Sequence, residues 1–305
     1  MKHRQLVVKD NALINASYNL DLVEQRLILL AIVEARENGQ GINTTEPLVI
    51  HADTYAHQFG VHRNTAYEAL QKACDQLFER GFSYQESLKK GVAHIRSRWV
   101  SQIAYLPSTA SVQLIFSPAV VPMITALEKH FTSYELEQVS ELRSAYAVRL
   151  YEILIAWRSV GQTPIISLED FRAKLGVEPH KYQRMHHFKA KVLDAAIEQI
   201  NLHTDIFATY EQQKNGRSIS GFKFSFKMKK APPKTAINGF STINKLSEKQ
   251  ISYFSDLLSR APEMAKYSKA GWDYKEFARW IEAELSKEER LKEWRSILEK
   301  VGLKA

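Results

Sequence analysis

The chain has 305 residues and a mass of 35.0 kDa, which is enough for two domains or slightly more. Its 45% hydrophobic and 25% charged residues are ordinary for a globular protein, and no apolar run approaches the roughly 20 residues of a membrane-spanning helix. Cys74 is the single cysteine, which excludes an intrachain disulfide and a multi-cysteine zinc site and favours a reducing cytosol.

The formal net charge of +8 is concentrated in the middle of the chain. Residues 1–140 carry a net charge of −1, residues 141–230 a net charge of +6, and residues 231–305 a net charge of +3. All of the middle excess lies within residues 180–230, which hold ten basic and four acidic side chains. A basic patch on one domain is typical of proteins that bind a polyanion, most often a nucleic acid. Charge alone is also compatible with a surface that is basic only for solubility.

Apolar periodicity in the first half predicts a helix over residues 20–37 and then a helix-turn-helix followed by strands. The expected order is a strand over 47–50, helices over 53–59 and 64–79, and strands over 82–88, 93–106 and 111–116. Gly60 and Gly81 follow the helices over 53–59 and 64–79, and glycine is a typical residue at the end of a helix. Residues 117–136 are expected to form a connecting helical stretch.

The same order returns in the second half. We expect a helix over 141–159, a strand over 163–166, helices over 168–175 and 181–201, and strands over 205–212 and 218–226. At a constant offset of 116 residues, three positions in the first half match three in the second, namely Ile50 with Ile166, Tyr55 with Phe171, and Gly60 with Gly176. Each copy reads helix, strand, helix, tight turn, helix, hairpin, which is the order of a winged helix.

The sequence therefore predicts an α+β fold with tandem duplicated winged-helix domains followed by a small helical C-terminal extension. Residues 1–140 would form the first winged-helix domain with its connecting helix, and residues 141–230 the second. Residues 231–244, which include Pro232 and Pro233, are expected to be a linker. Residues 245–305 are expected to be helical, either as a small domain or as helices that pack on a partner.

The helix predicted over residues 181–201 is the best candidate for reading DNA. One side of this helix is apolar and is expected to pack in the core. The opposite side is basic in its N-terminal half. Recognition helices read bases with their N-terminal residues, where Arg184 could contact guanine and Gln183 adenine. Lys181 and Lys191 suit phosphates. Lys189 falls on the apolar side, so either the helix start is irregular or its stem reaches out to solvent.

The second hairpin is the candidate wing. Its connection, residues 214–217, contains Asn215-Gly216, a strong turn signal, and places Lys214 and Arg217 at the tip for contact with the DNA backbone. The first copy looks different, because its long helix carries Glu68, Asp75 and Glu79 and its hairpin is almost neutral. The first winged helix would bind DNA weakly or serve as the dimerisation domain. In a dimer, exposed strands of its hairpin would pair with those of a second molecule of the protein.

Three segments of the sequence resemble the iteron-binding plasmid replication initiators, the Rep proteins with two winged helices. They are residues 6–14 and 24–32 (LVVKDNALI and EQRLILLAI), residues 146–152 (YAVRLYE), and residues 188–201 (FKAKVLDAAIEQIN). The resemblance covers about residues 6–230 in the right order and leaves residues 231–305 without an assigned role.

This resemblance implies a bacterial cytoplasmic protein that binds directly repeated origin sites in double-stranded DNA as a monomer, mostly through its second domain. Family members help to melt neighbouring AT-rich DNA, recruit the host initiator and replicative helicase, and repress their own gene as dimers. The resemblance places on the DNA face Lys181, Arg184, His187, Lys189 and Lys191, with Lys214 and Arg217 at the wing. It implies no cofactor, no metal and no membrane partner.

Three other functions compete with initiation. An enzyme is disfavoured, because the sequence has no phosphate-binding loop of the G-x-x-x-x-G-K-[ST] type and Met185-His186-His187-Phe188 lacks the metal spacing of a rolling-circle nickase. Cys74 reads as a small core residue rather than a nucleophile. A winged-helix transcriptional repressor without a replication role is the closer alternative, since the same fold would serve. The third is an assembly factor that acts through its C-terminal tail.

Overall fold

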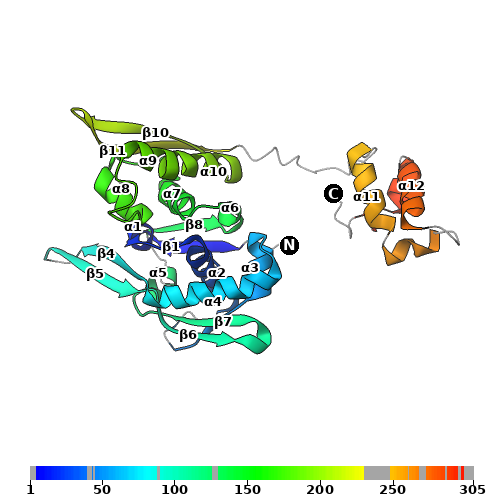
Figure 1. The fold of residues 1–305 in the computed structure, drawn as a ribbon, viewed down its shortest axis with the longest axis horizontal. Coiled ribbons are helices and arrows are strands. Elements are labelled where there is room, and N and C mark those ends of the chain that lie inside the picture. The colour runs from blue at the N-terminus through cyan, green and yellow to red at the C-terminus, as the bar shows by residue number, and fades with distance from the viewer. Residues whose placement is uncertain are drawn as a thin grey trace. The chain divides into compact units, whose positions relative to one another are not determined.

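The computed structural model describes residues 5–39, 43, 45–87, 90–125, 130–229, 248–259, 261–267, 273–285, 287–294 and 297–298. The chain divides into two compact units, Met1–Lys230 and Ala231–Ala305 (Figure 1). The predicted linker over residues 231–244 lies outside the described residues. Within the described ranges, no helix is both long enough and apolar enough to cross a membrane.

The first winged helix begins with α2 (Leu22–Asn38), the helix predicted over residues 20–37. A capping box starts it, because the Asp21 carboxylate accepts from the Glu24 N–H and the Glu24 carboxylate accepts from the Asp21 N–H. The following elements are β3 (Leu48–His51), α3 (Ala52–Phe59), α4 (Arg63–Glu79), β4 (Gly81–Ser87), β5 (Val92–Arg98), β6 (Val100–Leu106), the 3₁₀ turn η1 (Pro107–Thr109) and β7 (Ser111–Phe116).

The single strand predicted over residues 93–106 is wrong, because the chain changes sheets at Trp99. β5 pairs with β4 in a sheet of order β2-β4-β5, in which β2 is Ser17–Tyr18, whereas β6 pairs with β7 in a sheet of order β3-β7-β6. The Trp99 ring is fully buried, with its centroid 4.9 Å from those of Tyr18 and Phe82. Burial of this indole separates the two strands, so the β4–β5 hairpin is an insertion between α4 and the wing.

The helical prediction over residues 117–136 is also wrong in its second half. The chain forms α5 (Val121–Thr125), then β8 (Phe131–Glu135), then α6 (Glu137–Ser140). β8 pairs antiparallel with β1 (Leu6–Asp10), which precedes α1 (Asn11–Asn15). Each strand has five residues and its partner lies more than 100 residues away, so local periodicity does not reveal the pairing.

The second winged helix has the predicted order of elements. Its elements are α7 (Ala145–Ile155), β9 (Ile166–Ser167), α8 (Leu168–Leu175), α9 (Met185–Phe188), the π-helical segment η2 (Lys189–Asp194), α10 (Ala195–His203), β10 (Ile206–Asn215) and β11 (Ser218–Met228). The segments α9, η2 and α10 form one continuous helix. Figure 1 shows this helix and the long β10–β11 hairpin lying along one edge of the unit.

The internal duplication is confirmed by the matching positions of its elements. α3 and α8 have the same length and start 116 residues apart, and both end at a glycine with positive φ, Gly60 at +61° and Gly176 at +72°. A side chain disfavours this left-handed conformation, which is why glycine follows both helices. The sheets also agree, because β3-β7-β6 and β9-β11-β10 have the same strand order. Both copies are therefore winged helices.

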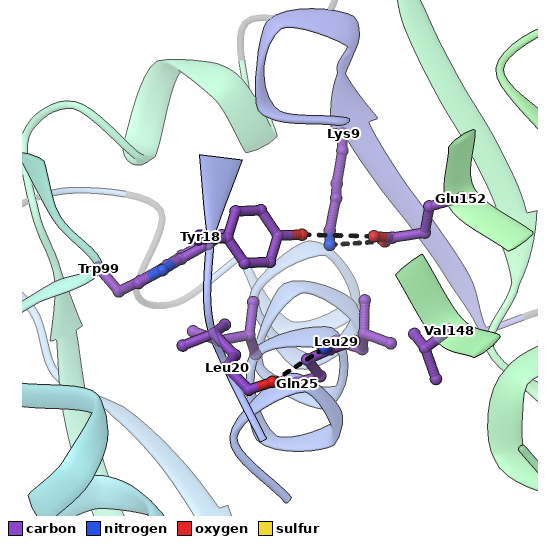
Figure 2. Close-up of a pocket in the computed structure, with 9 residues that line it drawn as sticks. Lys9, Tyr18, Leu20, Gln25, Leu29, Trp99, Val148 and Glu152 are labelled. Carbon is purple, nitrogen blue, oxygen red and sulfur yellow. Dashed lines mark hydrogen bonds and ion pairs between the residues drawn. The ribbon is translucent and has the colours of Figure 1, made fainter. Parts of the chain in front are cut away.

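A buried ion cluster joins the N-terminal strands to the first helix of the second copy (Figure 2). The carboxylate of Glu152 on α7 accepts hydrogen bonds from the Lys9 ammonium at 2.7 Å and from the hydroxyls of Tyr134 at 2.7 Å and Tyr18 at 3.4 Å. Arg149, one helical turn earlier, pairs with the same carboxylate at 2.8 Å. Burial alone would raise the pKa of Glu152, but the charges of Lys9 and Arg149 outweigh it and lower that pKa to about 2.

The guanidinium of Arg149 connects three segments of the chain. It donates to the carbonyls of Ile14 at 2.9 Å and Ala16 at 3.1 Å in the first copy, and to that of Lys174 on α8 at 3.1 Å. Its carbon Cζ lies 4.0 Å from the ring centroid of Tyr18. A buried arginine is tolerated only when its donors are satisfied, and here they hold the two winged helices together.

The C-terminal unit has a hydrophobic core of its own. Its described elements are α11 (Glu248–Ser259), the 3₁₀ segment η3 (Pro262–Tyr267), α12 (Tyr274–Leu285) and α13 (Glu288–Glu293). Trp294 is fully buried among Phe254, Leu258, Ile281 and other apolar side chains. The sequence left open whether residues 245–305 form a domain or need a partner for their apolar faces. In the structure, the described helices of this segment pack around an apolar core of their own.

Candidate nucleic-acid interface

The recognition helix of the second copy begins at Met185, four residues later than predicted. Arg184 is its N-cap residue and is extended, with φ of −75° and ψ of 124°, and Tyr182 has a positive φ of +51°. A left-handed residue cannot continue an α-helix, so Lys181, Gln183 and Arg184 lie in the turn before it. The prediction that these three side chains sit on the helix is therefore wrong. All three are exposed at its N-terminal end.

Arg172 on α8 organises this turn, and sequence reasoning missed it. Its guanidinium donates to the carbonyls of Lys181 at 2.6 Å, Tyr182 at 3.1 Å and Glu178 at 3.3 Å. Its Cζ also lies 5.1 Å from the ring centroid of Phe188 on α9. These bonds hold the nine-residue turn, 176–184, in one conformation, whereas the turn of the first copy has only three residues, 60–62. An arginine near the end of the first helix gives no specific sequence signal.

The turn is also fastened to the first copy through Glu178. One oxygen of its carboxylate accepts from the Asn19 amide at 2.7 Å, and the other pairs with the Lys181 ammonium at 2.9 Å. The hydrogen bond from Lys181 is the main cause that lowers the pKa of Glu178, and the same bond raises the pKa of Lys181. The positive charge of Lys181 is thus partly balanced by the Glu178 carboxylate.

The π-helical segment η2 explains the position of Lys189, which the helical wheel placed on the apolar side. Bonds from residue i to i+5 widen one turn and shift the phase of the residues that follow. Phe188, Val192, Leu193, Ala196 and Ile200 remain buried across the shift. Lys189 is half-buried, and its ammonium lies 3.4 Å from the Gln212 side-chain oxygen and 5.8 Å from the Tyr210 ring centroid on β10. Its head group is therefore directed at the wing strand.

His187 and Lys191 are exposed on the same helix, together with His186, whose ring centroid is 4.9 Å from that of His187. Further along, Asp194 accepts a hydrogen bond from the Tyr210 hydroxyl at 2.6 Å. The Asp194–Tyr210 bond and the Lys189 contact fasten the helix to β10. His186, His187 and Lys191 are thus left exposed, whereas Lys189 and Asp194 contact the wing.

The wing is the long β10–β11 hairpin, with Lys214 and Arg217 exposed at its end. Asn215 pairs with Ser218, so the two-residue loop is Gly216-Arg217, one residue later than the Asn-Gly signal suggests. Gly216 has a φ of +62°, as the first central residue of a type II′ turn requires. Arg217, the second central residue, does not have a positive φ. The register shifts between Gln213 and Lys214, a bulge that twists the tip.

The free cations of the second copy gather around its recognition helix and wing. Within the described part of the chain, no ion pair engages Arg184, Lys191, Lys214 or Arg217. Phe222, Phe224 and Phe226 face the core from β11, so Lys223 and Lys227, at the alternate positions, face outward. An exposed helix start flanked by a basic hairpin is the geometry that places side chains in a DNA groove and on its phosphates.

The first copy lacks these features on its own helix-turn-helix. Arg63, at the start of α4, pairs with Asp53 at 2.5 Å, and the exposed side of α4 carries Glu68, Asp75 and Glu79. Its wing strands, β6 and β7, contain no charged residue. The helix-turn-helix of the first copy therefore presents a more acidic described surface than that of the second copy.

Among the residues that the structure describes, no three potential metal ligands gather. Cys74 is buried in the core, and burial raises the pKa of its thiol to about 12, so the thiol stays protonated at neutral pH.

Comparisons with known proteins match both copies. The family model of the initiator replication protein WH1 domain matches residues 6–155, and that of the initiator Rep protein WH2 domain matches residues 167–226. A replication initiation protein of Escherichia coli is 28% identical over 193 residues, which cover 61% of this chain and 60% of that protein. The chain thus aligns with less than two thirds of the length of that relative.

Two solved structures are also similar to the chain. The WH1 domain of the replication protein MSBI1.176, isolated from a multiple sclerosis patient, is 64% identical and covers 42% of this chain and 98% of its own, with a TM-score of 0.35. The Pi initiator protein in complex with iteron DNA is 22% identical, with a TM-score of 0.61, and covers 76% of this chain and 100% of its own. The second likeness shows the fold. Because family models match both halves in the order that the duplication requires, the chain belongs to the family of initiator replication proteins with two winged-helix domains.

Proposed function

We propose that this protein is a plasmid replication initiator that binds directly repeated origin sites, or iterons, in double-stranded DNA. The observation that carries the proposal is the exposed start of the recognition helix beside a basic wing, in a chain of the initiator family. Arg184 and Gln183 would read base edges, and Lys191, Lys214 and Arg217 would hold phosphates. The contacts of Lys181 with Glu178 and of Lys189 with Gln212 make these two lysines weaker candidates.

The test is a binding titration over a series of salt concentrations. One duplex carries the direct repeats next to the gene, and the other is scrambled with the same composition. We expect a large ratio between the two affinities and stepwise occupancy of successive repeats. Equal, weak and salt-sensitive binding to both duplexes would refute the proposal and leave only a basic surface.

The proposal extends to later steps of initiation. Bound monomers would promote opening of the neighbouring AT-rich DNA and recruit the host initiator and replicative helicase in the bacterial cytoplasm. The chain would do this without a catalytic step of its own. Sensitivity of the origin to a single-strand-specific reagent, with and without the protein, tests the opening.

Dimers that repress the gene of the protein are part of the same proposal. In the described sheets of the first copy, β5 and β6 are edge strands, and an edge strand can pair with a second chain. We expect sedimentation of the full-length chain to show a monomer–dimer equilibrium, and we expect dimers to prefer an inverted repeat at the promoter. A chain that sediments as a monomer at high concentration would contradict this part.

Two other functions are separated from initiation by simple experiments. A repressor without a replication role would bind a lone inverted repeat and ignore arrayed direct repeats. An assembly factor that acts through its tail would fail when residues 231–305 are removed. Because the C-terminal unit has its own core, the truncated chain should keep both its fold and its DNA binding.

A further inference from the structure

The inserted hairpin β4–β5 carries a second basic surface that neither helix-turn-helix includes. In the β2-β4-β5 sheet, Ser17 pairs with Ser83 and Ser83 pairs with Arg96, so these three side chains lie across three strands on one face. Gly81 and Arg98 pair on the same face. Tyr18 and Phe82 point to the other face, where they pack on Trp99.

This face holds an open depression of about 480 Å³. Its lining residues are Ser17, Glu79, Gly81, Phe82, Ser83, Arg96, Ser97 and Arg98. Its lining thus combines small residues, glycine and serine, with two arginines. Its size is that of a small ligand site, large enough for a phosphodiester group.

The charges around the depression are mostly positive. Arg96 is exposed, and among the described residues its side chain has no hydrogen-bond or ion-pair partner. Arg98 pairs with the exposed carboxylate of Glu79 at 3.1 Å and also donates to the Phe78 carbonyl. His94 continues the row of exposed side chains on β5 toward the hairpin end. Glu79 therefore neutralises one arginine and leaves the other free.

The sheet is continuous with the turn that precedes the second recognition helix. The Tyr18 carbonyl lies so close to Gly176 that a Cβ there would come within 2.3 Å of it. The next residue, Asn19, donates to Glu178 in the turn at 2.7 Å. In Figure 1 the β4–β5 and β10–β11 hairpins both end at the left of the unit. The sheet that carries the free arginine on β5 thus meets, at its other edge, the turn that precedes the second recognition helix.

We propose that this depression binds a phosphate group of the DNA backbone, as a second contact for the DNA held by the second winged helix. This inference rests on the proposed function. Guanidinium and hydroxyl donors match phosphate oxygens, and such a contact adds affinity without reading sequence. The positive contribution of the first copy to DNA binding then comes from its inserted hairpin rather than from α4 or the β6–β7 wing.

The test compares R96Q with R36Q in the full-length chain. Both variants remove one exposed arginine from the first copy, but Arg36 lies at the end of α2, outside the depression. Each lost phosphate contact lowers the slope of log affinity against log salt by about 0.9. We expect this change for R96Q and none for R36Q. The affinity deficit of R96Q relative to wild type should therefore be about 3.5-fold larger at 50 mM salt than at 200 mM salt.

The expected result includes an equal loss on the iteron duplex and on the scrambled duplex, with the specificity ratio unchanged. A slope for R96Q equal to that of wild type and R36Q would overturn the inference. So would an R96Q effect on dimer dissociation alone, because the face would then bind a second copy. If wild type failed to prefer iterons, the proposed function would fall, while the slopes on scrambled DNA would still decide the phosphate contact. Unchanged thermal unfolding of R96Q confirms that the variant is folded.

Discussion

Asn19 and Glu178 meet across the two winged helices through a hydrogen bond of 2.7 Å from the Asn19 amide to the Glu178 carboxylate. The second oxygen of that carboxylate holds Lys181, a residue that sequence alone assigns to DNA. One carboxylate therefore sets the position of the turn before the recognition helix and reduces the charge that this turn offers to DNA.

The first prediction concerns this carboxylate. Glu178→Gln removes a negative charge and frees Lys181, while the new amide oxygen can still accept from Asn19. We expect tighter binding to every duplex and a salt slope that is larger by up to about 1. Titration of specific and scrambled DNA measures both. Asn19→Ala is the control, because it removes the hydrogen bond without changing the charge; a steeper slope for that variant as well would contradict the electrostatic explanation.

The second prediction separates base reading from phosphate contact. Arg184→Ala should weaken binding to the specific site by about 1–3 kcal/mol and relax preference at one base position. Lys214→Ala at the wing should weaken all sequences similarly and lower the salt slope by about 1. A panel of single-base variants of the repeat, titrated with each protein, distinguishes the two effects. Equal losses on specific and scrambled DNA for both proteins would show that Arg184 does not read a base.

The third prediction concerns Arg172 as a positioning residue. Arg172→Ala removes the donor of three backbone carbonyls in the turn, and bonds to a charged donor contribute about 1.5–3 kcal/mol each at most. We expect a loss of preference for the specific duplex together with faster amide exchange in residues 177–184. Arg172→Lys should restore little, because an ammonium cannot match the fork of a guanidinium. Loss of affinity with unchanged exchange in the turn would argue for a direct DNA contact instead.

The fourth prediction concerns the buried ion cluster. Glu152→Gln leaves Lys9 and Arg149 without a counter-charge in the core, so it should lower the free energy of unfolding by about 3–5 kcal/mol. Lys9→Met should be milder, because Arg149 still balances Glu152. Urea denaturation at pH 7 measures both variants. A larger loss for Lys9→Met would mean that Arg149 does not compensate the carboxylate.

The carboxylate of Glu152 also makes the stability of the fold depend on pH. The pKa of Glu152 is lowered to about 2 in the folded chain, below its ordinary value of 4.5, so its ionised form stabilises the fold above about pH 4.5. That contribution is lost as the pH falls from 4.5 toward 2, because the unfolded chain takes up the proton first. The stability difference between wild type and Glu152→Gln should therefore shrink over this range. A difference that stays constant down to pH 2 would show that folding does not lower the pKa of Glu152.

Much of the fold can be read from local sequence signals. Gly60 and Gly176 mark the ends of two equal helices, because only glycine readily takes the left-handed conformation found there. The alternation of apolar residues predicts the strands β7 and β11, whose alternate residues Val112, Leu114, Phe222 and Phe224 are buried. The common order of elements in the two halves and the constant offset of 116 residues indicate the duplication, and with it the winged-helix fold.

The details of the candidate interface follow from contacts that no local pattern contains. The helix starts at Met185 because Arg172 holds a turn with Tyr182 in the left-handed region, and Lys189 turns to the wing because η2 changes the helical phase. Sheet exchange at Trp99 creates the inserted hairpin. The physical reason is distance along the chain: propensity and capping act over a few residues, whereas Asn19 and Glu178 are 159 residues apart and meet only when both copies have folded.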